Sequence, residues 1–287
     1  MKNKNNKQKA IFYIIISAFC FAVMNCCVKL AGDLPTGQKS FYRNLVAVFV
    51  ALFTIIKNKT GFNYKIKDLP LFIVRASAGT MGILGNFYAI DHMPVANASM
   101  LNKMSPFFAV IFSFLFLKER PKLYQVLGIF VAFLGAMFII KPGGDFGDVM
   151  PALVGFCGGM GAGCAYTAVR ALGERGVKGS LIVLFFSVFS CLAVLPLMLI
   201  DNKPMSLWQL AALLGAGVAA TGGQFSITAA YANAPAKEIS VFDYTQIIFA
   251  TVLGFILFAE IPDVYSFIGY GIICSVSVFF FLKSKNE

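Results

Sequence analysis

Two ionisable side chains, Lys103 and Asp243, lie deep inside apolar runs of the sequence. Counted along a helix from Pro94 and Pro235, the prolines that precede them, they lie about 13 Å and about 12 Å into their runs. If these runs cross a bilayer, both side chains fall near the middle of a hydrocarbon core about 30 Å thick. An ionisable group at that depth costs on the order of 2.5–3.5 kcal/mol, so both residues are functional candidates.

Polar residues surround Lys103 and Asp243 at matching positions in the two runs. Their i, i+3, i+4 spacing puts each set on one face of a helix. The two sets are Ser99, Asn102 and Lys103, and Ser240, Asp243 and Tyr244. We expect them to face an aqueous cavity and contact substrate, with Asp243 as the coupling residue. The alternative is a buried Lys103–Asp243 pair that only fixes helix packing.

Further polar side chains occur singly within apolar runs and are candidate substrate contacts. They are Asn25, Asn86, Tyr88, Tyr166, Gln224 and Gln246. Any one of them could instead hydrogen-bond a neighbouring helix. His92, the single histidine, is expected to be a solvated loop residue.

Three basic residues lie closer to the ends of the apolar runs. Lys29 and Arg43 are within a few residues of a predicted helix end, so we expect their side chains to reach the headgroup region. Arg75, six residues into its run, is expected to have a structural or interfacial role, and the alternative is that it adds positive charge to the cavity beside Lys103.

The composition excludes a soluble globule. Of the 287 residues, 59% are hydrophobic and 13% are charged, about half the usual charged fraction. The length accommodates about ten helical crossings of roughly 20 residues each, with no room for a soluble domain. The predicted spans are Ala10 to Leu30, Ser40 to Ile56, Leu69 to Ile90, Ala96 to Leu117, Leu123 to Ile140, Val149 to Ala171, Leu181 to Ile200, Leu207 to Tyr231, Ile239 to Phe258 and Val264 to Leu282.

Basic residues are distributed unequally between the two sides of these spans. Seventeen Lys and Arg residues fall in the terminal segments and even-numbered loops, and three fall in the odd-numbered loops. The positive-inside rule therefore predicts a plasma (inner) membrane protein with both termini in the cytoplasm. The net charge of +11 forms no continuous stripe, so nucleic acid is not an expected partner.

An internal repeat relates residue n to residue n + 141. The segment 89–128 aligns without gaps to 230–269. In this alignment Pro94, Glu119 and Pro121 match Pro235, Glu260 and Pro262. The repeat predicts two five-helix halves, residues 1–145 and 146–287. Because five is odd, the second half must enter the membrane from the opposite side, as in many secondary transporters.

Several segments, taken in order, are similar to one known family. The run FAVMNCCVKLAG, the later F-Y-R-N and the L-K-E-R-P that follows the fourth span resemble the EamA family of the drug/metabolite transporter superfamily. The resemblance implies that helices 1 to 4 and 6 to 9 enclose a central cavity, with helices 5 and 10 at the periphery. It also implies transport of amino acids, nucleotide-derived metabolites or other small organic solutes.

The expected function is secondary active transport of a small zwitterionic or anionic metabolite by alternating access. We expect no catalytic residue, metal site or cofactor. A proton is a candidate coupling ion, and both a monomer and a homodimer are compatible with the sequence. The alternatives are a membrane-embedded enzyme or a flippase for lipid-linked substrates, and a channel. An enzyme would need paired carboxylates or a His/Asp/Glu cluster at a membrane face.

The distribution of basic residues generates a topological prediction. A reporter that is active only in the cytoplasm, fused after Glu287, is expected to be active in whole cells. The same reporter placed after Lys203, in an odd-numbered loop, is the control and is expected to be silent. Activity of the second fusion alone would contradict the assigned orientation.

Overall fold

The chain is built from helices. The computed structural model describes residues 2–59, 61, 64–117, 122–140, 149–233 and 240–285, and no strand occurs in those ranges. The helices are α1 (Lys2–Leu30), α2 (Thr36–Lys57), η1 (Ile66–Asp68), α3 (Leu69–His92), α4 (Val95–Asn102), α5 (Ser105–Leu117), α6 (Leu123–Ile140), α7 (Met150–Glu174), α8 (Gly179–Ile200), α9 (Leu207–Asn233), η2 (Ser240–Tyr244), α11 (Thr245–Phe258) and α12 (Val264–Lys285).

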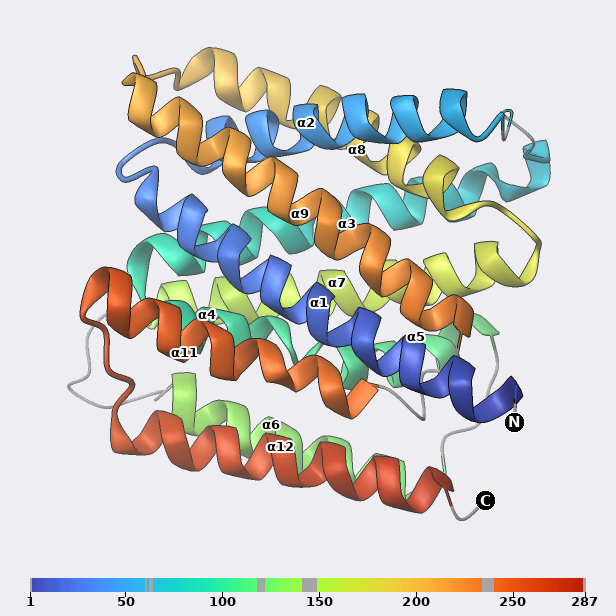
Figure 1. Ribbon diagram of the computed structural model, residues 1–287. Helices are drawn as coiled ribbons and strands as arrows, with labels where there is room; N and C mark the ends of the chain where they lie inside the picture. The colour runs from blue at the N-terminus through green and yellow to red at the C-terminus, as the bar shows by residue number, and fades with distance from the viewer. Residues whose placement is uncertain are drawn as a thin grey trace.

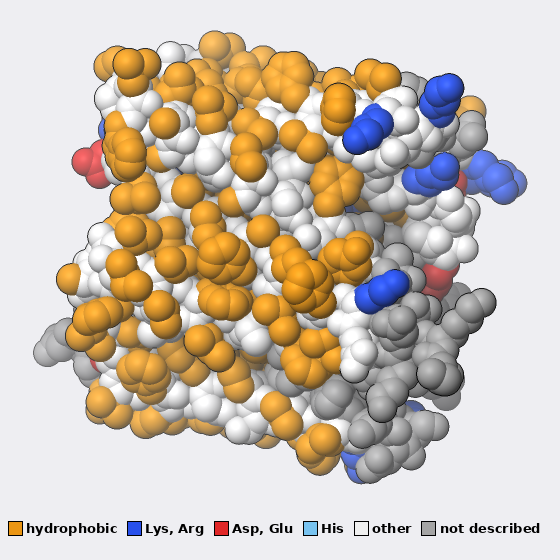
Figure 2. Space-filling model, in the orientation of Figure 1, with side chains coloured by type: hydrophobic (Ala, Val, Ile, Leu, Met, Phe, Trp, Pro, Cys, Tyr) orange, Lys and Arg blue, Asp and Glu red, His pale blue; other side chains and the backbone are white. Residues whose placement is uncertain are grey.

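The outer surface is suited to lipid. Seven helices in the described ranges are long and apolar enough to cross a membrane, and two shorter apolar helices cover 242–258 and 264–280. Large apolar side chains such as Phe49, Phe130 and Leu192 are exposed, which in water would be unfavourable. Figure 2 shows such side chains across the visible face, with Lys and Arg gathered toward the end where Figure 1 places both termini.

The helices pack with a twofold pattern. The closest pairs are α1 with α9 and α3 with α7, and the repeat relation converts one pair into the other. The pairs α2 with α8 and α6 with α12 each map onto themselves. Figure 1 shows α1 beside α9 and α6 beside α12. The fold is therefore the expected all-α membrane fold of ten spans in two inverted five-helix repeats, in which α4–α5 and η2–α11 each form one span and α3 is added to the nine apolar segments above.

The fourth span is interrupted in its middle. The sequence predicts one helix over Ala96 to Leu117, whereas α4 ends at Asn102 and α5 begins at Ser105. Pro106 explains the interruption, because it has no N–H to donate and its ring clashes with the carbonyl of Asn102. The corresponding part of the ninth span, Ser240–Tyr244, is a 3-10 helix. Both spans therefore change geometry next to Lys103 and Asp243.

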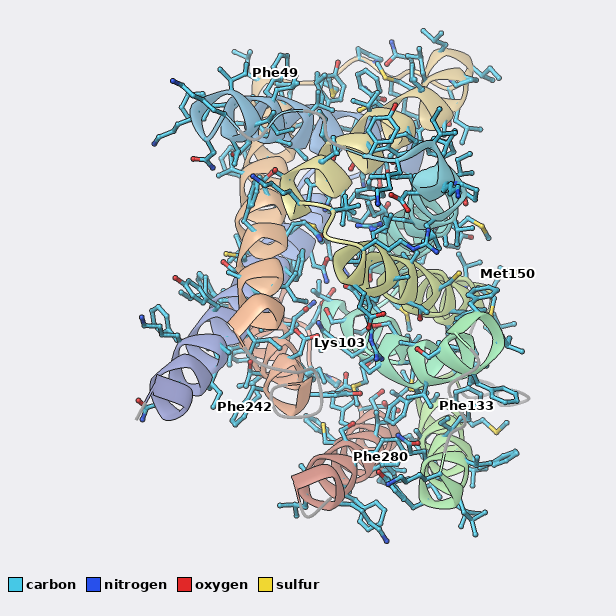
Figure 3. The ribbon with its side chains drawn as sticks, turned by 90° about the vertical axis from the view of Figure 1, so that its right-hand side faces the viewer. Phe49, Lys103, Phe133, Met150, Phe242 and Phe280 are labelled. Carbon is cyan, nitrogen blue, oxygen red and sulfur yellow. The ribbon has the colours of Figure 1, made fainter. Side chains whose placement is uncertain are left out.

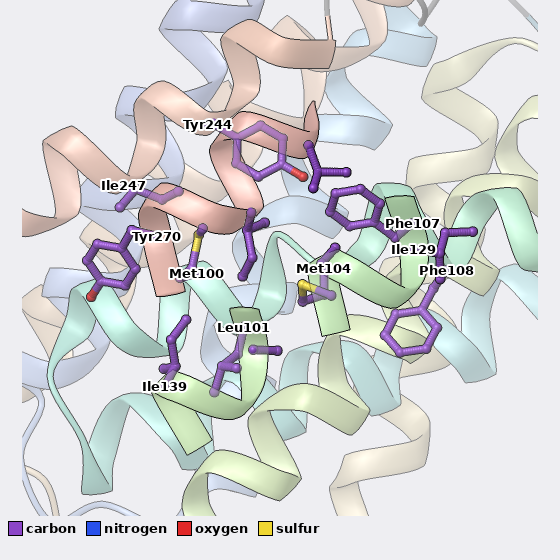
Figure 4. Packing of buried hydrophobic residues seen from close by; sticks show 14 of the residues in the cluster. Met100, Leu101, Met104, Phe107, Phe108, Ile129, Ile139, Tyr244, Ile247 and Tyr270 are labelled. Atoms are coloured by element: carbon purple, nitrogen blue, oxygen red, sulfur yellow. The ribbon is translucent and has the colours of Figure 1, made fainter. Parts of the chain in front are cut away.

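A buried apolar cluster holds the interrupted span in place. Met100, Met104 and Phe107 pack with Ile139 of α6 and Ile247 of α11 (Figure 4). The cluster therefore ties α4 and α5 to the second repeat and to the peripheral helices.

Glycines on α7 allow its backbone to touch the interrupted span. Gly155, Gly159 and Gly163 recur every four residues and form a stripe of small residues along the helix. A Cβ added at Gly159 would lie 2.5 Å from the carbonyl oxygen of Leu101, and one at Gly163 would lie 2.6 Å from that of Ser105. Only glycine permits this separation between α7 and the break.

Gly159→Ala is expected to lower the midpoint of thermal unfolding by roughly 3–10 °C, because the new methyl group forces α7 away from Leu101. Gly173→Ala on the same helix is the matched control, since nothing lies within 4 Å of its added Cβ. Purified protein in detergent is suitable for this measurement. Equal midpoints for the two variants would show that the close contact is unimportant.

Candidate functional site

Lys103 and Asp243 form an ion pair in the interior of the bundle. Nζ of Lys103 lies 2.7 Å from Oδ2 of Asp243, and the two side chains are 4% and 6% exposed. Seen from the end that carries the termini, Lys103 lies inside the bundle, while Phe49 and Met150 lie at its edge (Figure 3). Oδ1 of Asp243 has no hydrogen-bond partner among the described residues. The carboxylate therefore keeps an unused acceptor.

Tyr244 completes the break in the fourth span. Its hydroxyl donates to the carbonyl oxygen of Lys103 at 3.0 Å. This carbonyl belongs to the turn that interrupts the helix, and a buried carbonyl without a partner would be costly. Lys103 and Tyr244 occupy equivalent positions in the two repeats. Equivalent residues meet at the axis that relates the repeats, so the Lys103–Asp243 ion pair lies on the pseudo-twofold axis.

A chain of amides connects three helices beside the ion pair. Asn86 on α3 donates to Oδ1 of Asn25 at 3.2 Å, and Asn25 on α1 donates to Oγ of Ser99 at 3.0 Å. Oδ1 of Asn86 and Oε1 of Gln246 remain without hydrogen-bond partners within the described ranges. These two oxygens can accept hydrogen bonds from a solute.

A polar cavity of about 80 Å³ lies at the centre of the bundle. Most of the side chains that line it are buried. The sequence-predicted residues that line it are Asn25, Asn86, Asn102, Lys103, Tyr166, Gln224 and Gln246. None of its lining residues comes from α6 or α12, in agreement with the peripheral place that the family resemblance implies for helices 5 and 10.

Other predicted site residues lie elsewhere. Ser99, Asp243 and Tyr244 are buried next to the cavity without lining it. Tyr88 stacks on His92 with ring centroids 4.3 Å apart, away from the cavity. The side chain of Ser240 lies outside the described residues.

Two expectations about basic residues are wrong. Lys29 does not reach for headgroups, because it forms an ion pair with Glu260 and donates to the carbonyl of Met93. Arg43 is buried and lines the cavity. The error arose because α2 begins at Thr36 rather than Ser40, which puts Arg43 about two turns inside the helix.

Arg75 also lines the cavity, which was the alternative to the structural or interfacial role expected from the sequence. It is buried, and its guanidinium carbon lies 4.1 Å from the ring centroid of Phe186 on α8. A basic residue six positions into an apolar run was the available signal. The composition of the run alone does not separate an interfacial arginine from one that faces a cavity.

An ion pair between the repeats lies at each end of the bundle. At the end opposite the termini, Lys29 pairs with Glu260, whose Oε2 also accepts from the backbone N–H of Val95 at 2.9 Å. At the end with the termini, Arg175 donates to Asp68 at 2.8 Å and holds the pKa of that carboxyl below its usual value. Each pair joins the first repeat to the second.

Comparison with known proteins identifies relatives along nearly the whole chain. The model of the EamA-like transporter family matches residues 8–141 and again residues 149–282. The pseudopaline exporter CntI of Pseudomonas aeruginosa is 32% identical over 282 residues, which cover 97% of this chain and 98% of the exporter. A riboflavin transporter of Brucella anthropi is 24% identical, covering 93% of this chain and 96% of the transporter.

More distant similarity extends to eukaryotes and to a solved structure. Human solute carrier family 35 member G1 is 26% identical, with 88% of this chain and 73% of the carrier covered. One crystal structure superposes with a TM-score of 0.68 over 97% of this chain and 98% of that chain, at 14% identity. This superposition supports the fold.

Removing one partner of the buried pair is expected to be more harmful than removing both. Lys103→Met or Asp243→Asn alone should cost about 3–5 kcal/mol of stability, because each change leaves a buried polar or charged group uncompensated. The double variant should recover most of that loss. Chemical or thermal unfolding of all three variants tests this prediction, and additive losses in the double variant would count against a coupled pair.

Proposed function

The chain belongs to the EamA-like transporter family, and on this basis we propose that it is a secondary active transporter of a small polar organic solute that works by alternating access. The observation that carries the proposal is the Lys103–Asp243 pair, buried on the pseudo-twofold axis beside a cavity lined by polar side chains. A site near the midplane and between inverted repeats is suited to being opened from either side in turn.

The proposal includes the orientation and the division of the chain. Both termini lie in the cytoplasm and the protein resides in the plasma (inner) membrane. Support comes from the unequal distribution of basic residues between loops and from the basic side chains near the termini in Figure 2. Residues 1–145 form the first repeat and residues 146–287 the second.

Asp243 acts as the coupling residue in this proposal. While Lys103 is within hydrogen-bonding distance, its ammonium group stabilises the ionised carboxylate. If substrate or a rearrangement separates the two side chains in the interior, binding of a proton to Asp243 would neutralise the carboxylate that has lost its partner. Substrate occupancy and proton binding would thereby become linked.

The substrate is proposed to be a zwitterionic or anionic metabolite. The names of the relatives specify pseudopaline in one case and riboflavin in another, so the shared fold accommodates chemically different metabolites. Arg43, Arg75 and Lys103 line this cavity, whereas no carboxylate of the described residues does. A dication would be repelled from such a site.

An enzyme or a lipid-linked flippase remains the alternative function. The relatives that match almost the entire chain are named as transporters. Among the described residues, no group of three His, Cys, Asp or Glu side chains is placed to hold a metal ion. The observations therefore support transport of a soluble solute more strongly.

Asp243→Asn is expected to abolish accumulation of solute driven by a pH gradient, while exchange at equal pH on both sides remains measurable. The neutral amide cannot bind and release the coupling proton. The measurement uses proteoliposomes and a solute selected by a thermal-shift screen of metabolites. Lys103→Ala is the comparison variant and should weaken binding, most strongly for anionic solutes. Normal accumulation by Asp243→Asn would show that the acid is structural.

A further inference from the structure

We propose that Arg43 and Arg75 form an anion-binding subsite for a solute that presents two negative charges, as a pair of carboxylates or a phosphate. The inference rests on the proposed function, because it takes the central cavity as the transport site. It goes further by assigning the acidic part of the substrate to two residues that are distinct from the Lys103–Asp243 pair.

Both guanidinium groups are buried and have unused donors. Arg43 and Arg75 are 4% and 3% exposed, and Nε of each has no hydrogen-bond partner within the described ranges. Arg43 donates through Nη1 to Oδ1 of Asn44, which in turn donates to Oγ of Ser190 at 2.9 Å. Asn44 thus fixes the orientation of Arg43 and leaves donor capacity for a ligand.

Arg75 lies in a space that the fold keeps open for it. Its guanidinium stacks on the ring of Phe186, and Gly79 lies one turn further along α3. A Cβ at Gly79 would lie 2.2 Å from Nη1 of Arg75. The guanidinium of Arg75 therefore occupies the space that a side chain at position 79 would fill. A planar guanidinium held in this way can bind a carboxylate or phosphate through two parallel hydrogen bonds.

The charges of the cavity do not balance. Asp243 compensates Lys103, but no described acidic side chain lines the cavity to compensate the two arginines. Most other described acids are engaged elsewhere, in the pairs Lys29–Glu260, Lys39–Asp91, Arg170–Glu174 and Arg175–Asp68. Both arginines line the same cavity, and like charges there are mutually repulsive. Two buried positive charges that have no acidic partner among the described residues are unfavourable until a ligand with two negative charges enters.

The unused acceptors near the arginines define the rest of the ligand. Oδ1 of Asn86 and Oε1 of Gln246 belong to residues that line the same cavity and lack donors among the described residues. They match an ammonium, hydroxyl or amide group on the solute. The chemistry of the site therefore fits a compound with two acidic groups and at least one hydrogen-bond donor.

The test measures thermal unfolding of the purified full-length protein with succinate and with succinamide, its uncharged counterpart. Succinate at saturating concentration should raise the midpoint of the wild type by about 3 °C or more, and succinamide should not. Arg43→Gln and Arg75→Gln should each lose the succinate shift. Gly79→Ala, which keeps every charge but displaces the guanidinium of Arg75, should reduce it. Lys178→Gln removes an exposed positive charge and should retain the full shift.

Stability without ligand provides the second readout. Because the arginines are uncompensated, Arg75→Gln should unfold at or above the wild-type midpoint, whereas a purely structural arginine would leave the variant several degrees lower. Equal succinate shifts in the wild type and both glutamine variants, including no shift in any of them, would overturn the subsite. A succinate shift that depends on the arginines, together with no solute flux in proteoliposomes, would instead reject the proposed transport function and keep the subsite.

Discussion

A buried ion pair between the interrupted fourth span and the 3-10 segment of the ninth is the constraint on which the rest of the structure depends. Lys103 and Asp243 are favourable in a low-dielectric interior only while they remain together, so the fourth and ninth spans must meet at this depth. The helix ends that the breaks create need partners as well, and the Tyr244 hydroxyl supplies one to the carbonyl of Lys103. The surrounding helices exclude lipid from this junction, and the glycines of α7 let its backbone close against it.

The general architecture could be predicted from the sequence because it follows from composition and symmetry. Apolar length sets the spans, and the offset of 141 predicted the two inverted halves. The same offset aligned Asn102 with Asp243 and Lys103 with Tyr244, and these four residues do lie together at the centre. Neither observation requires knowledge of how any side chain packs.

The place of Arg43 in the cavity could not be predicted, because it depends on where the polar end of a helix is buried. Gln38 and Lys39 precede the second predicted span, Ser40 to Ile56, whereas the structure buries both of them within α2. For this reason Arg43 was expected at the membrane surface, whereas it lines the cavity. The prediction that Tyr88 contacts substrate failed for a related reason. The presence of a polar residue within a span does not reveal which helix face it occupies, and Tyr88 stacks on His92.

The two halves are related in sequence position but not in chemistry at the axis that joins them. Exchanging the repeats converts the Lys103–Asp243 pair into Tyr244 with Asn102, two uncharged side chains. A rearrangement that interchanged the roles of the halves would therefore replace a salt bridge by a neutral contact. The two arrangements cannot have the same free energy, so the empty protein has a preferred resting state that a symmetric pair of repeats would lack.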